Sequence, residues 1–72
     1  MKKLKKIKIK VNGKIHTFID KSTLYELINH LNIPVKKVAI ELNKEIANKK
    51  RLRRIKLKNN DIIEIVHFIG GG

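Results

Sequence analysis

Residues 4–19 read LKKIKIKVNGKIHTFI, an alternation of apolar and polar side chains that Asn12-Gly13 interrupts once. Residues 4–11 put Ile7, Ile9 and Val11 on one side and lysines on the other, which is the period of a half-buried strand. Asn-Gly accepts the positive φ angles of a type I′ turn. The pattern therefore predicts a hairpin with a two-residue turn, whose second strand is residues 14–19.

The two-residue turn also predicts which residues face each other across the hairpin. Ile7 is expected opposite Phe18, on the side of the core. Ile15 and Ile19 are then expected on the other face of the sheet. A bulge of one residue would reverse the faces of the second strand.

A helix is predicted after the hairpin. Thr23 is a suitable N-cap, and Glu26 three residues later completes a capping box. Apolar residues then recur at helical spacing and form one stripe for packing on a sheet: Leu24, Leu27, Ile28 and Leu31. The helix is expected to stop near Asn32, because Pro34 disfavours helical geometry in the residue before it.

The second half of the chain contains shorter elements. Residues 38–42, VAIEL, are predicted to form a third strand. A tight turn at Asn43-Lys44 and a short fourth element at residues 45–46 follow. Residues 47–61 are mostly polar and are expected to form a loop. Three apolar residues of this loop are the expected anchors in the core: Leu52, Ile55 and Leu57.

The last strand leads into three glycines. Residues 62–68, IIEIVHF, are apolar on both faces, which favours a central position in the sheet. Because glycine loses the most backbone freedom on ordering, glycines 70–72 cannot help to hold a fold together, and are either slack or used. The apolar residues just before them are Val66, Phe68 and Ile69. They are either exposed docking residues for partner proteins or caps on the core, and both interpretations stay open here.

The composition bounds the class of protein. The chain has 72 residues, which suits one domain of modest stability, and no cysteine, which excludes disulfides and thiolate sites. No apolar run approaches the roughly 18 residues of a membrane span, and the N-terminal MKKLKKIKIK alternates where a signal peptide would be continuously apolar. We therefore expect a soluble cytoplasmic protein without a membrane partner.

The formal charge is +12, from 18 Lys and Arg against 6 Asp and Glu. Its densest part is residues 48–56, NKKRLRRIK. Such a surplus attracts polyanions, so one interpretation is a nucleic-acid patch, and the other is a solvated loop. The solvated loop is favoured and nucleic acid is not expected as a partner, because this stretch lacks the aromatic side chains on which single-strand binders stack bases.

The order of the predicted elements is strand, strand, helix, strand, short strand, strand. This order resembles the β-grasp, or ubiquitin-like, fold: an α+β mixed sheet of four to five strands with one main helix on one face. The resemblance implies that the first and last strands lie side by side and parallel at the centre. It also implies a division into a β-grasp domain, residues 1–69, and a flexible glycine tail, residues 70–72.

A narrower resemblance covers nearly the whole chain in the same order. The stretches that carry it are TLYELINHL (residues 23–31), VAIELNKEI (38–46), NDIIEIVHF (60–68) and the terminal GGG. Together they resemble the ThiS family, the sulfur carriers of thiamine thiazole synthesis. One departure is visible: family members often carry Pro-Arg shortly after the second stretch, where this chain has Asn48-Lys49.

The resemblance to ThiS implies a definite chemistry. An adenylating, E1-like partner would use ATP to convert the Gly72 carboxylate into an acyl-adenylate. Sulfur from a persulfide, such as that of a cysteine desulfurase, would then give a thiocarboxylate, and thiazole synthase would accept the sulfur. Gly70 and Gly71 would let the tail thread a narrow channel.

Other chemistry finds little support. His16, His30 and His67 have no ligand spacing, so no metal site is predicted. Ser22 and Thr23 fit helix caps, and no nucleophile elbow is present. No Walker-type phosphate loop is present either, so ATP is expected on the activating partner and no cofactor on this chain. We expect no catalytic activity from the chain alone.

Three alternatives to the thiamine role stay open. Another tail-activated β-grasp protein, such as the small subunit of molybdopterin synthase or a protein modifier, would share the glycine tail. A small basic RNA-binding domain is supported by the charge of +12. A bare interaction module would use the glycines as slack, and deletion of Gly71 and Gly72 would then have no consequence downstream.

Overall fold

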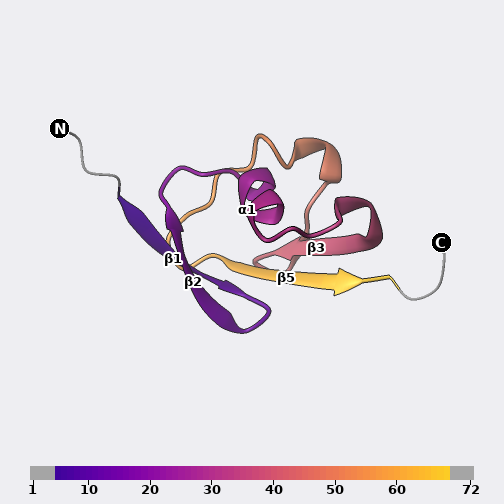
Figure 1. Cartoon of the computed structure of the whole chain (residues 1–72), viewed down its shortest axis with the longest axis horizontal. Coiled ribbons are helices and arrows are strands. Elements are labelled where there is room, and N and C mark those ends of the chain that lie inside the picture. Colours follow the sequence, from indigo (N-terminus) through magenta and orange to yellow (C-terminus); the bar gives the residue numbers. More distant parts are fainter. Residues whose placement is uncertain (1–4, 69–72) are drawn as a thin grey trace.

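The computed structural model describes residues 5–68, which form a five-stranded sheet with one α-helix on one face (Figure 1). In chain order the elements are β1 (Lys6–Val11), β2 (Lys14–Ile19), α1 (Leu24–His30), the 3₁₀ turn η1 (Val35–Lys37), β3 (Val38–Leu42), β4 (Glu45–Ile46), the 3₁₀ turn η2 (Lys49–Arg51) and β5 (Ile62–His67). The strand order is β2-β1-β5-β3-β4. β5 is parallel to β1 and antiparallel to β3, so the expected parallel centre is confirmed.

The β1–β2 hairpin has the predicted register. Ile7 lies opposite Phe18, and the turn residues Asn12 and Gly13 have φ angles of 49° and 84°. Phe18 packs against the core, whereas Ile15 is 68% exposed on the other face. The positive φ angles twist the hairpin in the sense of the strands, which is why a two-residue turn without a bulge suffices.

The helix α1 begins after the predicted N-cap, Thr23, and ends near Asn32, as predicted from Pro34. The Thr23 hydroxyl accepts a hydrogen bond from the Glu26 backbone amide at 3.1 Å, and the Glu26 carboxylate accepts one from the Thr23 amide at 2.9 Å. Leu31 is the C-cap, and Asn32 follows with a φ of 57°. The helix therefore covers the sheet with only seven residues, and its buried face is Leu24, Leu27 and Ile28.

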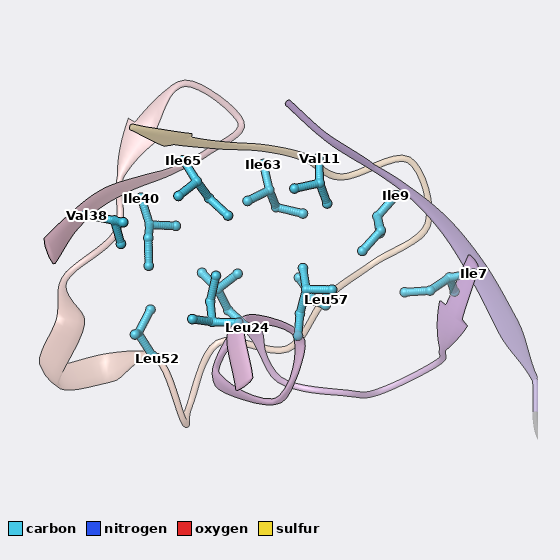
Figure 2. Packing of buried hydrophobic residues seen from close by; sticks show 12 residues of the cluster. Ile7, Ile9, Val11, Leu24, Val38, Ile40, Leu52, Leu57, Ile63 and Ile65 are labelled. Carbon is cyan, nitrogen blue, oxygen red and sulfur yellow. The ribbon is translucent and has the colours of Figure 1, made fainter. Parts of the chain in front are cut away.

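The core lies between α1 and the facing side of the sheet (Figure 2). The strands contribute Ile7, Ile9, Val11, Val38, Ile40, Ile63 and Ile65. The loop before β5 contributes Leu52 and Leu57, each 2% exposed, and Ile55 packs against the cluster. The three predicted anchors of this loop are thus confirmed. The turns η1 and η2 were not predicted, because three-residue turns of this kind have no apolar period of their own.

β5 occupies the predicted central position, although only one of its faces is covered. Ile63 and Ile65 point into the core, whereas Ile62 and Val66 are 41% and 58% exposed on the face opposite α1, called the outer face below. The strand is central because it pairs with β1 and β3. Its apolar side chains on the outer face are not buried by any other part of residues 5–68.

Four predicted site residues, Ile69 and glycines 70–72, lie outside the residues that the structure describes. The division between a domain ending at residue 69 and a glycine tail therefore stays a prediction. Between residues 5 and 68, no helix is long and apolar enough to cross a membrane.

Candidate functional site

The candidate site begins at the end of β5, just before the last four residues of the chain. β5 pairs with β3 up to Val38 and His67. One residue further, the Phe68 amide donates a hydrogen bond to the Lys37 carbonyl oxygen at 2.9 Å. The backbone is therefore held at the edge of the glycine segment, at one end of the sheet (Figure 1).

Asn12 holds β5 from the side of β1. Its side-chain oxygen accepts a hydrogen bond from the Ile65 amide at 2.7 Å, and its side-chain nitrogen donates to the Ile65 carbonyl at 3.3 Å. Its own amide donates to the Ile63 carbonyl at 2.9 Å. β1 ends at Val11, so the amide group of Asn12 takes the place of one further strand residue beside β5.

Asn43 performs the same task from the side of β3. Its side-chain oxygen accepts a hydrogen bond from the Ile62 backbone amide at 2.9 Å, and its own backbone amide donates one to the Ile62 carbonyl oxygen at 2.7 Å. Its side-chain nitrogen donates to the Asp61 carboxylate at 3.0 Å, and that buried carboxylate also accepts from the Lys58 amide at 2.7 Å. The sequence predicted Asn12 and Asn43 only as turn residues, because their partners on β5 are far away along the chain.

The predicted docking residues are exposed where the structure describes them. Val66 is 58% and Phe68 is 56% exposed, so neither caps the core. Among residues 5–68 the other large apolar side chains that are exposed belong to β2, β4 and β5: Ile15, Ile19, Ile46 and Ile62. Strand alternation puts these on the outer face together with Val66. The lysines of β1 lie on the same face, between the isoleucines of β2 and those of β5, so the exposed apolar residues form separate groups.

Two cationic side chains of the basic stretch around η2 contact aromatic rings of this chain. The Arg53 guanidinium lies 4.2 Å from the centre of the Tyr25 ring and donates to its hydroxyl at 3.1 Å. The Lys49 ammonium lies 5.2 Å from the centre of the Phe68 ring. Both are cation–π distances. One face of the Tyr25 ring is thus taken by Arg53, which agrees with a solvated loop.

The His, Asp and Glu side chains of the described residues do not form a metal site. Between residues 5 and 68 no three of the side chains His, Cys, Asp and Glu are grouped to hold a metal ion. His30 packs on Phe18, with ring centres 5.4 Å apart. Both carboxylate oxygens of Asp61 accept hydrogen bonds from within the fold, from the Asn43 side chain and the Lys58 amide. These side chains serve the fold.

The topology defines the class of protein. A β-hairpin, a helix across the sheet, and first and last strands that are parallel neighbours at its centre together make this a β-grasp protein. Its distinguishing site is the exposed apolar side chains of Val66 and Phe68, at the end of the strand that leads toward the glycines.

Comparisons with known proteins narrow the class to a family. The model of the ThiS family matches residues 5–72. The sulfur carrier protein ThiS of Bacillus subtilis (strain 168) is 40% identical over 65 residues, which are 89% of this chain and 98% of that protein. The crystal structure of a thiamine biosynthesis protein (ThiS) from Geobacter metallireducens superimposes with a TM-score of 0.81 at 29% identity, covering 92% of this chain and 100% of that one. The chain belongs to the ThiS family.

Another relative is much longer than this chain. A thiazole synthase of Magnetococcus marinus is 39% identical over 66 residues, which are 92% of this chain and 20% of that protein. A region similar to this chain is thus one part of a larger polypeptide in that organism.

Proposed function

We propose that this chain is a sulfur carrier of thiamine biosynthesis and that it carries the sulfur on the carboxyl group of Gly72. The observation that carries the proposal is that β5, held from the β1 side as far as Ile65 and from the β3 side as far as Phe68, leads through Ile69 into three glycines in a member of the ThiS family. The 40% identity to a named sulfur carrier, over nearly the full length of both chains, supports this role over that of other tail-activated β-grasp proteins.

The proposed chemistry takes place at the last carbonyl carbon. A carboxylate is a poor electrophile, so an adenylating partner first joins it to AMP at the expense of ATP, with release of pyrophosphate. A persulfide, such as that of a cysteine desulfurase, attacks this carbon and AMP leaves. Cleavage of the resulting S–S bond by a thiol leaves the thiocarboxylate. Gly71 and Gly72 present no Cβ to the attacking sulfur.

This chain contributes presentation to the reaction, and its partners contribute the catalysis. ATP is bound by the adenylating enzyme, and the chain itself needs no cofactor. Thiazole synthase is the proposed acceptor of the sulfur. The similarity of this chain to a region within proteins named thiazole synthase supports that pairing, because sequences joined in one polypeptide commonly act on each other. The absence of cysteine fits a reducing, cytoplasmic compartment.

Intact-mass spectrometry tests the carrier role. The chain is incubated with the cognate adenylating enzyme, ATP and a cysteine desulfurase with cysteine. We expect a mass gain equal to the replacement of one oxygen by sulfur, located on Gly72 by fragmentation. A chain that lacks Gly72 is the matched control and should gain nothing. No gain on the native chain, or an equal gain on the control, would overturn the proposal.

The exposed apolar residues before the glycines are the proposed docking site for these partners. Val66→Asp puts a charge within that contact, so we expect the affinity for the adenylating enzyme to fall by about tenfold or more. Ile15→Asp is the matched control: Ile15 is 68% exposed, on the same outer face but on the edge strand β2. Titration calorimetry measures both, and an equal loss would show that only general apolarity matters. The contribution of Ile69 follows from the same experiment with Ile69→Asp.

A further inference from the structure

The end of the sheet where β5 stops is surrounded by lysine and arginine side chains from two other parts of the chain. η1 carries Lys36 and Lys37, and η2 carries Lys49, Lys50 and Arg51, all exposed. Figure 1 shows η1, just before β3, and η2, the orange coil, at the end toward which β5 points. We call these five residues the basic collar.

Two contacts tie the basic collar to the base of the glycine segment. The Lys37 carbonyl oxygen accepts the hydrogen bond from the Phe68 amide at 2.9 Å. The Lys49 ammonium lies 5.2 Å from the centre of the Phe68 ring. Segments that are about thirty and twenty residues away along the chain therefore meet at the same residue, the last one before Ile69–Gly72.

The charge of the basic collar is not balanced locally. Residues 34–40, 47–54 and 65–68 contain no aspartate or glutamate. Glu41 of β3 and Glu64 of β5 lie opposite each other in the sheet, farther from the end where β5 stops. Concentrated charge of one sign on a surface raises the rate and selectivity of encounter with a surface of the opposite sign.

We propose that the basic collar docks on carboxylates that rim the channel through which a partner enzyme receives the glycine tail. The inference rests on the proposed function, since it assumes that the tail enters such a channel. Gly72 is four residues after Phe68, a reach of at most about 13 Å when the chain is extended. With the tail extended in the channel, the basic collar stays at its mouth while the carboxylate of Gly72 reacts inside it.

RNA is the competing occupant, and the geometry disfavours it. The aromatic rings beside the basic stretch, Tyr25 and Phe68, are already contacted by Arg53 and Lys49. A base that stacked on the ring faces that these cations occupy would have to displace them. A carboxylate rim requires no such change.

A pair of charge-reversal variants tests the proposal. The collar variant carries Lys36→Glu, Lys37→Glu and Lys50→Glu, and leaves Lys49 in contact with Phe68. The far-end variant carries three reversals at and just before the start of β1, which lies away from the end of β5: Lys5→Glu, Lys6→Glu and Lys8→Glu. Each variant changes the net charge from +12 to +6, since 12 − 6 = 6. Thermal melting confirms that both remain folded.

The readout is the affinity for the cognate adenylating enzyme without ATP, measured at about 50 and about 300 mM NaCl. The Debye screening length differs more than twofold between these two salt concentrations. We expect the collar variant to bind about tenfold or more weakly at low salt, with a smaller difference at high salt, and the far-end variant to bind within about threefold of the native chain. Equal losses in the two variants would show an effect of net charge alone, and no loss in the collar variant would equally overturn the proposal.

Two further arms separate the possible failures. Binding of a single-stranded RNA that falls only in the collar variant, while enzyme binding is unchanged, would assign the surface to nucleic acid instead. The mass gain on Gly72 of the native chain tests the carrier role independently of the collar. A gain in the native chain together with unchanged binding of the collar variant would refute the basic collar and leave the carrier role standing.

Discussion

Asn12 shows how much one residue contributes to the presentation of the tail. Its φ of 49° suits few residue types other than glycine and asparagine, and its side chain also bonds both backbone groups of Ile65. The first property is local and follows from the Asn-Gly pair. The second depends on a strand more than fifty residues later in the chain. Asparagine is therefore required here for two reasons, of which only one can be recognised in the sequence.

Asn12→Gly separates these two properties. Glycine keeps the positive φ but loses both side-chain hydrogen bonds, so we expect the free energy of unfolding to fall by about 1–2 kcal/mol. Asn60→Gly is the matched control: Asn60 has a φ of 73°, is exposed, and bonds Lys8 through its backbone amide, which glycine keeps. Urea unfolding measures both. A loss for Asn60→Gly as large as for Asn12→Gly would contradict the role of the side-chain bonds.

At the scale of elements, α1 is the part whose local signals and tertiary packing agree most closely. Seven residues are too few for a helix that is stable alone in water. The capping box of Thr23 and Glu26 and the burial of Leu24, Leu27 and Ile28 against the sheet together make it stable. The sequence predicted this helix well because its caps and its apolar stripe lie within nine residues.

Thr23→Ala tests the capping box. It removes the acceptor for the Glu26 amide, so we expect a loss of about 1 kcal/mol in the free energy of unfolding. Thr17→Ala is the control, since Thr17 is exposed on β2 and caps no helix. Chemical unfolding followed by circular dichroism should show the larger shift of the midpoint for Thr23→Ala. Equal shifts would mean that the cap adds nothing beyond general helix or strand preference.

For the whole molecule, the charge of +12 is the property that acts over the longest distance. Like charges repel each other in the compact state more than in the expanded unfolded chain, so the surplus lowers stability at low ionic strength. The same surplus is available for attraction to acidic partners. The lysines thus lower the stability of the fold and favour binding to acidic partners. Added salt screens the repulsion, so the change in stability with salt measures its size.

We expect the thermal midpoint to rise between about 20 and about 300 mM NaCl, because screening weakens the repulsion. A variant with Lys5, Lys6 and Lys8 replaced by glutamine has a net charge of +9, since 12 − 3 = 9, and should rise less. Differential scanning calorimetry of both proteins gives the comparison. A midpoint that falls with salt in the native chain would mean that attractive ion pairs, and not repulsion, dominate its electrostatics.

The elements that the sequence predicted correctly are those whose cause lies within a few residues. The Asn-Gly turn, the hairpin register, the capping box and the turn at Asn43 depend on local φ angles, alternation and spacing. The order of these elements, with the quoted family motifs, then predicted the β-grasp topology and the ThiS family, which the strand order and the family match confirm.

Long-range packing determined the features that had no local signal. It brought Asn12 and Asn43 to opposite sides of β5, left Val66 and Phe68 exposed, and gathered the basic collar from η1 and η2. The physical reason is that hydrogen-bond partners, burial and the meeting of distant charges depend on which strands become neighbours. That outcome is set by the joint burial of the whole aliphatic core, which no single stretch of residues expresses.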